Sequence, residues 1–396
     1  MTTPTPEDDG GGLGLARLVL GQTFLHASMA GMRLAMPLLA LREGHSAAAV
    51  GVLLAMFAIT QVFLALPAGR YADRHGLKRP MALSVAAAVL GAGLAAAWPV
   101  FPVLCLGALL TGGATGAAVI ALQRHVGRAA SGALQLRQAF SWLSIGPAVS
   151  NFVGPFLAGL LIDHAGFRTA FVVMALFPLG CWFWVRRARE APRAEAQAAA
   201  RGGRAWDLLR EPGFRRLMVV NWVLSSAWDV HTFIVPVLGH ERDLSASVIG
   251  AILGAFAVAA ALVRTSLPLI PSTVREWQVI LAAMWGAAVA FALYPLMPSA
   301  LAMGACSVLL GLALGAVQPM IMSTLHQITP EHRQGEALGL RLMAINASSV
   351  LMPMLFGAAG TLIGASGLFW TVGAVLAGGT RLASGLRHHD AGDHRP

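Results

Sequence analysis

Polar side chains with the chemistry to bind a ligand or a proton occur inside long apolar stretches of this sequence. Gln22, His26 and Arg33 recur at helical spacing in the first stretch, and with Met29 they fall within about 60° of one helix face. A similarly narrow stripe in a later stretch consists of Asn221, Ser225, Trp228 and Thr232, with Asp229 beside it. Ionisable groups inside apolar segments are costly and are candidates for function.

These residue types suggest definite roles. Arg33 is suited to bind an anionic or carbonyl group of a ligand, or to pair with Asp229. Asp229 is the best candidate for a group that takes up and releases a proton, because burial and a neighbouring Arg act on a carboxyl group in opposite directions. His26 and His231 are secondary candidates. The alternative is a structural Arg33–Asp229 pair that holds two parts of the chain together.

The amino-acid composition indicates the kind of protein that contains these stripes. The 396-residue chain is 57% hydrophobic and 12% charged, with a mean hydropathy of +0.68, whereas a soluble domain carries roughly 25% charged residues. Apolar runs of about 20 residues, enough to cross a hydrocarbon core, recur along the chain. We expect a polytopic membrane protein whose spans are α-helices, because the bilayer offers no partners to backbone polar groups.

Apolar runs separated by charged or Gly/Pro breaks predict twelve spans. In the first half they cover 15–40, 47–68, 79–99, 101–122, 139–162 and 168–186. In the second half they cover 214–238, 246–270, 277–297, 299–325, 336–363 and 366–384.

Charge predicts the orientation and the division of the chain. Lys and Arg concentrate in alternate loops, which places both termini in the cytoplasm. The net charge of +10 is then explained by an anionic leaflet, and no nucleic-acid partner is needed. The predicted parts are an N-terminal tail 1–14, a six-helix lobe 15–186, a cytoplasmic linker 187–213, a second lobe 214–384 and a C-terminal tail 385–396.

The two halves match at a nearly constant offset of 199 residues. Pro37 corresponds to Pro236 and Gly112 to Gly311, and the two polar stripes also superimpose at this offset. An offset of six helices keeps both halves in the same topology, which predicts parallel repeats about an axis along the membrane normal. Two-lobed transporters of this kind carry a midplane site between the lobes.

The stretch "GRYADRHGLKRP", residues 69–80, resembles the signature G-x-x-x-D-R-x-G-x-[RK]-[RK] of the major facilitator superfamily. The residues that fit are Gly69, Asp73, Arg74, Gly76, Lys78 and Arg79. The resemblance extends over the whole chain and implies an all-α fold of twelve transmembrane helices. It also implies a cytoplasmic latch in which Asp73 reaches the start of the eleventh helix, where Arg341 stands. Plain positive-inside anchoring is the alternative, and it explains only the basic residues.

A second stretch, "SNFVGPFLAG", is similar to the G-P-x-x-G-G signature of the antiporter branch. Gly154, Pro155 and Gly159 fit, whereas Ser150 and Ala158 stand where the pattern has Gly. Close helix packing explains small residues here equally well. The resemblance is incomplete elsewhere, since many proton-coupled exporters of the family carry an Arg early in the fourth helix and this chain has none there.

Other features add less. Weaker cavity-lining candidates, each equally explained as an interhelical hydrogen bond, are Gln61, Asn151, Gln318 and Asn346. Arg264 could snorkel or attract anions. No phosphate-binding G-x-x-x-x-G-K-[ST] motif occurs, and we expect no enzyme activity, no cofactor and no metal.

The resulting expectation is a major-facilitator-type secondary transporter of the bacterial inner membrane. It would export a small amphipathic or anionic compound in exchange for protons by alternating access. The alternatives are a proton symporter that imports an organic acid, or a lipid-handling or sensing protein on the same scaffold. Its partners would be the small-molecule substrate, protons and membrane lipids, and the family's architecture suggests a monomer.

Overall fold

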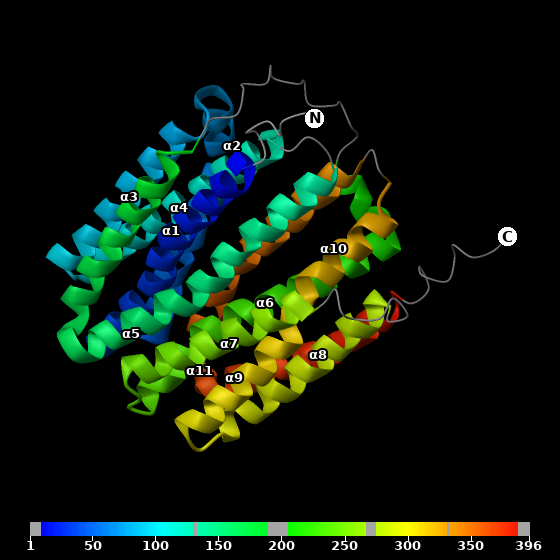
Figure 1. Cartoon of the computed structure of the whole chain (residues 1–396). Helices are drawn as coiled ribbons and strands as arrows, with labels where there is room; N and C mark the ends of the chain where they lie inside the picture. The colour runs from blue at the N-terminus through cyan, green and yellow to red at the C-terminus, as the bar shows by residue number, and fades with distance from the viewer. Residues whose placement is uncertain (1–8, 130–132, 189–204, 267–274, 331–332, 387–396) are drawn as a thin grey trace, which may run out of the picture. The chain divides into compact units, whose positions relative to one another are not determined.

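The computed structural model describes residues 9–129, 133–188, 205–266, 275–330 and 333–386, and every regular element within them is a helix (Figure 1). The first half contains α1 (Asp9–Arg42), α2 (Ala47–His75), α3 (Lys78–Ala97), α4 (Phe101–Ala129) and α5 (Ala133–Val185). The second half contains η1 (Ala205–Arg210), α6 (Pro212–Glu241), α7 (Ala246–Ser266), α8 (Glu276–Leu293), η3 (Tyr294–Leu296), α9 (Ala300–Gly315), α10 (Val317–Ile328) and α11 (Gln334–Ser384).

Two of these helices are pairs joined by a single glycine. Gly166 in α5 has φ 79° and Gly364 in α11 has φ 71°, a left-handed conformation that glycine adopts without steric cost. The chain reverses at each glycine, at equivalent places in the two halves. When α9 and α10 are taken as one span, each of the twelve expected spans corresponds to a helical segment.

Hydropathy supports membrane insertion of these helices. Within the described residues, ten stretches are long and apolar enough to cross a membrane. One of them, Ile145–Val185, has 41 residues and contains the break at Gly166, so it holds two spans. The helix α6 is not among the ten, and it is the helix that carries the polar stripe around Asp229. The fold is therefore the expected all-α membrane architecture of two six-helix repeats.

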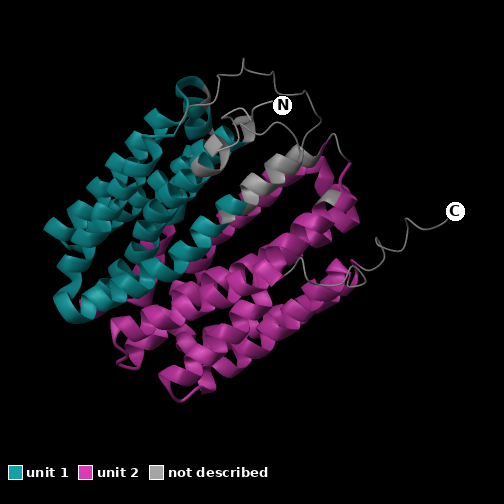
Figure 2. Cartoon of the chain, viewed as in Figure 1, with its two compact units in different colours: residues 1–40, 56–198 teal, residues 41–55, 199–396 magenta. Residues whose placement is uncertain are grey.

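The chain forms two compact units (Figure 2). Unit 1 comprises residues 1–40 and 56–198, and unit 2 comprises residues 41–55 and 199–396. The first part of α2 thus belongs to unit 2, where Gly51 lies against the backbone of Pro353 on α11. Unit 1 carries the polar stripe of α1, and unit 2 carries the polar stripe of α6.

The same close helix contact is built in both units. In unit 1, a Cβ atom at Gly112 on α4 would collide with the carbonyl group of Phe57 on α2. In unit 2, a Cβ atom at Gly311 on α9 would collide with the carbonyl group of Phe256 on α7. Glycine lets helix backbones approach closely where lipid supplies no hydrophobic driving force for association. The internal repeat of the sequence is thus visible as repeated packing.

The helices α1 and α5 also pack closely within unit 1. A Cβ atom at Gly154 would lie 2.5 Å from the carbonyl oxygen of Ala27 and 2.8 Å from the amide nitrogen of Gly31. The hydroxyl group of Ser150 donates to the carbonyl oxygen of Thr23 at 2.9 Å. Pro155 and Gly159 are buried on the same helix. The small residues of this motif therefore serve close packing in the structure.

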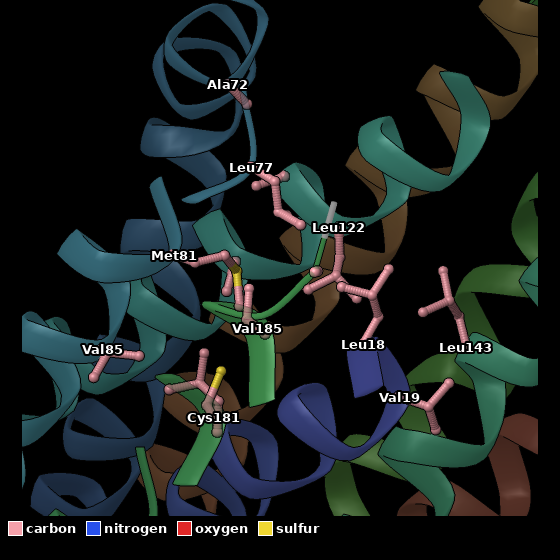
Figure 3. Close-up of a cluster of buried hydrophobic side chains, with 14 of the residues drawn as sticks. Leu18, Val19, Ala72, Leu77, Met81, Val85, Leu122, Leu143, Cys181 and Val185 are labelled. Carbon is pink, nitrogen blue, oxygen red and sulfur yellow. The ribbon is translucent and has the colours of Figure 1, made fainter. Parts of the chain in front are cut away.

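The charged stretch after the second span differs from the expected loop. The helix α2 continues to His75, so Gly69 and Arg74 are helical and only two residues separate α2 from α3. The reason is that charge ends a membrane span without ending a helix, because Arg and Ala are good helix formers. Gly76, with φ 75°, makes the turn. Leu77 and Met81 anchor it in the apolar core of unit 1 (Figure 3).

Candidate functional site

Unit 2 contains a cavity of about 170 Å³ at the middle of the polar stripe on α6. Its lining residues come from α6, α7, α9, α10 and α11, and they are Leu224, Ser225, Trp228, Asp229, Arg264, Leu314, Val317, Gln318 and Ile345. The cavity therefore brings together an acidic, a basic, an amide, a hydroxyl and an aromatic side chain within an apolar frame. Sites for small molecules commonly have this composition.

Two serines of α11 hold the carboxylate of Asp229. The hydroxyl group of Ser348 donates to Oδ2 at 3.2 Å, and that of Ser349 lies 3.3 Å from Oδ1 and 3.1 Å from Oδ2. Ser348 is also in hydrogen-bond contact with Ser226 at 2.9 Å. Asp229 is only 8% exposed, and hydrogen bonds to a charged group each contribute about 1.5–3 kcal/mol. The α6–α11 contact thus fixes where the negative charge lies.

Arg264 supplies the positive charge of the cavity. Its Nε donates to the carbonyl oxygen of Gly315 at 3.3 Å. Its guanidinium carbon lies 5.5 Å from the ring centroid of Trp228, within the range of a cation–π interaction. These contacts turn the side chain from α7 toward α9 and α6, so Arg264 is a cavity residue rather than a snorkelling one.

A buried aromatic and polar layer supports the cavity wall. Phe256 contacts Trp228 with ring centroids 4.5 Å apart and His231 with centroids 4.3 Å apart. The Nε2 atom of His231 is 3.0 Å from the hydroxyl oxygen of Ser307, which is 2.8 Å from the hydroxyl oxygen of Tyr294. His231, a secondary proton candidate from the sequence, therefore belongs to a structural network behind the wall.

Some polar atoms of the α6 stripe have no partner in the described part of the chain. The hydroxyl oxygen of Ser225 and both amide atoms of Asn221 are buried without a hydrogen bond there. Thr232 instead bonds to its own helix, at 2.9 Å from the carbonyl oxygen of Asp229. A buried polar group that lacks a partner costs about 1–3 kcal/mol. Ser225 thus combines a buried hydroxyl group, unbonded within the described residues, with a place in the cavity lining.

The corresponding stripe of α1 lies in unit 1. The Oε1 atom of Gln22 and the Nδ1 atom of His26 are likewise buried without a hydrogen-bond partner among the described residues. Arg33 is half-buried on the same helix. Since Arg33 and Asp229 belong to different units, their pairing stays a hypothesis.

The residues of the expected latch are only partly described. The side chain of Asp73 lies outside the described part of the structure. Arg341 is 6% exposed, and its Nε atom is buried without a hydrogen-bond partner in the described residues. Arg74 and Arg79 are exposed, whereas Gly69 lies close to Arg124, whose Nη2 atom would be 2.9 Å from a Cβ atom at that glycine.

Sequence reasoning missed part of this site. Ser348 and Ser349 were not among the candidates, although the polar sequence "NASS" inside an apolar helix was a visible signal. Arg264 was considered only as a snorkelling or anion-attracting residue. Gln318, a weaker candidate, does line the cavity. Which helices meet at a site is a property of packing, and the polar stripe of one helix does not reveal it.

Comparison with curated proteins yields bacterial relatives over most of the chain. The chain is 28% identical over 384 residues to the class C tetracycline resistance protein of Escherichia coli, covering 91% of this chain and 93% of the relative. It is 28% identical over 360 residues to the class D tetracycline resistance protein of Salmonella ordonez, covering 85% and 87%.

Solved structures share the fold. A bacterial homologue of the human lysosomal transporter Spinster matches with a TM-score of 0.76 at 14% identity, over 98% of both chains. The nucleoside transporter NupG matches with a TM-score of 0.73 at 15% identity, over 96% of this chain and 99% of that one. The family model of the Major Facilitator Superfamily matches residues 18–300 and 217–395. On this match over nearly its whole length, the chain belongs to the Major Facilitator Superfamily of membrane transporters.

Proposed function

We propose that this protein is a secondary active transporter that exports a small amphipathic or anionic compound in exchange for protons by alternating access. The cavity in unit 2 is the observation that supports this proposal, because Asp229, Arg264 and Gln318 line it together with Ser225, whose hydroxyl group has no hydrogen bond within the described residues. We place it in the bacterial inner membrane with both termini in the cytoplasm, on the distribution of Lys and Arg.

The size and the mixed polar and apolar lining of the cavity support an amphipathic substrate. Its volume of about 170 Å³ is below the roughly 300–1,000 Å³ of drug-sized sites, so unit 2 would hold only part of the molecule. The stripe of Gln22, His26 and Arg33 on α1 would hold the remainder. The relatives named as tetracycline resistance proteins make a polycyclic compound rich in oxygen atoms the first substrate to test, since removal from the cell is one route to resistance.

Asp229 would carry the exchanged proton. A carboxylate held by hydroxyl groups in an apolar cavity can change its protonation when a charged substrate replaces water beside it. Arg264, which remains charged in proteins, would receive an anionic or carbonyl group of the substrate. A positively charged group of an amphipathic substrate beside Asp229 would favour the ionised carboxylate, so such a substrate and the proton would compete for the site.

The test is proton flux in proteoliposomes that contain the full-length protein and a trapped pH-sensitive dye. Tetracycline is added first, followed by a panel of amphipathic cations and organic anions. Wild type is compared with Asp229→Asn, which keeps the size of the side chain and removes its charge. We expect substrate-triggered proton flux in the wild type and its loss in the variant.

Glu276→Gln is the matched control. Its carboxylate also accepts hydrogen bonds from a serine and an amide, from Ser323 and Gln327, both at 2.8 Å, but it does not line the cavity. We expect this variant to retain coupled flux. Undiminished flux in Asp229→Asn would remove the proton role of Asp229 and make His26 the next candidate.

One observation favours import of an organic acid as the second candidate function. The only arginine in the described cavity lining, Arg264, would attract a carboxylate. The two functions differ in the direction of coupled flux. Under an imposed proton gradient, a symporter moves labelled substrate in the same direction as the protons. A proton-coupled exporter moves the substrate in the opposite direction to the protons.

We further propose that Asp73 and Arg341 form the latch that closes one side of the transporter. The buried Nε atom of Arg341, which has no hydrogen bond within the described residues, supports a role in a contact made in another state. Cysteines introduced at both positions should crosslink in a substrate-dependent manner. Crosslinking that is independent of substrate, or absent throughout the cycle, would eliminate the latch.

A further inference from the structure

Unit 1 contains a larger hollow that the transport proposal does not use. It has a volume of about 460 Å³ and lies between α2, α3 and α4. Its lining includes Leu64 and Tyr71 from α2, Leu83 from α3, and Leu110 and Gly113 from α4. We call it the α2–α4 groove. Its volume is within the range of sites that hold a ligand of drug size.

The groove is apolar and opens to the surface of the unit. Leu64 and Leu83 are 43% and 57% exposed, and both belong to stretches that are long and apolar enough to cross a membrane. Gly113 lets α4 pack closely on α2 at the floor, because a Cβ atom there would lie 3.1 Å from the hydroxyl oxygen of Thr60. That hydroxyl group is itself bonded to the carbonyl oxygen of Leu109 at 3.0 Å. The floor thus accepts methylene groups and asks for no polar partner.

The sequence next to one end of the groove is rich in arginine. Tyr71 and Pro80 line the groove at this end, and the exposed residues Arg70, Arg74 and Arg79 are close to them in sequence, next to the α2–α3 turn. Leu77, which is 1% exposed in the apolar core, ties this turn to the unit (Figure 3). The three arginines thus flank, along the sequence, the lining residues Tyr71 and Pro80 at this end of the groove.

We propose that the α2–α4 groove binds one acyl chain of an anionic phospholipid, whose phosphate group is held by Arg70, Arg74 and Arg79. The apolar groove matches the chain and the basic end matches the headgroup. Guanidinium groups bind phosphate oxygens in pairs and with strong hydrogen bonds. The groove alone would accept an acyl chain of any lipid. The arginines alone would bind a phosphate group only weakly, so the proposed site needs both.

The experiment counts lipids retained by the purified full-length protein in native mass spectrometry. The probes are phosphatidylglycerol, phosphatidylcholine with the same acyl chains, and glycerol phosphate without chains. We expect retention of one phosphatidylglycerol, at least about tenfold weaker binding of phosphatidylcholine, and no binding of glycerol phosphate. Equal retention of the two lipids would overturn the headgroup assignment, and binding of glycerol phosphate would overturn the role of the chain.

Three variants locate the site. Ala117→Phe fills the groove and leaves the charges intact, so it should abolish retention. Leu83→Trp narrows the exposed rim and gives the same test if the first variant does not fold. A charge variant with Arg70, Arg74 and Arg79 changed to Gln should weaken retention at least about tenfold. Unchanged retention in the groove-filling variants would refute the proposal.

A second charge variant is the matched control for net charge. It changes three exposed arginines of unit 2, none of which lines the groove, to Gln, namely Arg210, Arg215 and Arg381. We expect it to retain phosphatidylglycerol as the wild type does. An equal loss in the two charge variants would show non-specific attraction and would refute a site in the groove.

Discussion

Replacing Gly311 by Ala tests whether helix packing in unit 2 sets the shape of the cavity. The added Cβ atom would collide with the carbonyl oxygen of Phe256, and would lie 2.9 Å from the Cβ atom of Ala259 and 3.2 Å from the carbonyl carbon of Phe256. All of these neighbours are backbone atoms or a Cβ atom, so none can swing aside. The helices α7 and α9 must therefore separate by a few tenths of an ångström or more.

The expected loss follows from two opposing terms. Overpacking in a close contact costs about 1–3 kcal/mol, and the gain from replacing Gly by Ala within a helix is about 1 kcal/mol. We expect a net loss of up to roughly 2 kcal/mol in the free energy of unfolding. Phe256 also contacts Trp228, so the shift should reach the cavity wall and weaken binding of the probe ligand tetracycline by up to about tenfold.

Two matched substitutions separate the consequences. Gly112→Ala makes the equivalent collision with Phe57 in unit 1, and neither residue lines the cavity of unit 2. Gly378→Ala adds a methyl group where no atom of the structure lies within 4 Å. Unfolding in detergent should show losses of stability for Gly311→Ala and Gly112→Ala and none for Gly378→Ala. Equilibrium binding should be weakened most by Gly311→Ala.

Two results would refute this reasoning. If Gly311→Ala unfolds like Gly378→Ala, the close α7–α9 contact does not limit stability. If Gly112→Ala weakens binding as much as Gly311→Ala, then the effect is general loosening and the path from Phe256 to Trp228 is not responsible.

Three further changes test individual contacts by thermal unfolding in detergent. Gly76→Val should destabilise the protein by at least about 1–2 kcal/mol, because a β-branched residue does not tolerate a left-handed conformation, and Gly76→Asn should be milder. Ser307→Ala removes the shared partner of His231 and Tyr294 and should cost about 1–3 kcal/mol, unlike the exposed Ser266→Ala. Arg168→Ala leaves two carbonyl groups at the end of α3 without their donor and should lower stability by about 1 kcal/mol, and Arg168→Lys should restore part of this loss. Stability equal to wild type in any of these three variants would show that the tested contact contributes nothing.

Most of the fold was predictable from the sequence because the membrane allows few solutions. Apolar length predicted the twelve spans, and the 199-residue offset predicted the repeat that the structure shows at Gly112 and Gly311. The second predicted span ended at residue 68, whereas the helix α2 continues to His75. Charged residues beyond the span can still extend the helix. The reversals at Gly166 and Gly364 were not recognised as single-residue turns, since glycine is common throughout this chain.

The site was predictable along one helix and not between helices. Helical spacing brought Ser225, Trp228 and Asp229 to one face of α6, and they do line one cavity. The hydroxyl groups of Ser348 and Ser349 come from a helix more than a hundred residues later, and only the packed structure shows that they hold Asp229. Long-range partners of this kind depend on the rotation of each helix, which an apolar pattern leaves open.

The buried polar atoms that have no hydrogen bond within the described residues support the proposal that the stripes bind a ligand. A helix that needed only to pack would be more stable with apolar side chains at Asn221 and Ser225, because each buried unpaired group costs about 1–3 kcal/mol. The same kind of atom occurs at Gln22 and His26 of α1, the positions that correspond to them in the repeat. The two units thus contain the same costly feature at equivalent positions. A bound substrate that bonds these atoms would offset the cost in the occupied state, and this difference between states is what a transporter requires.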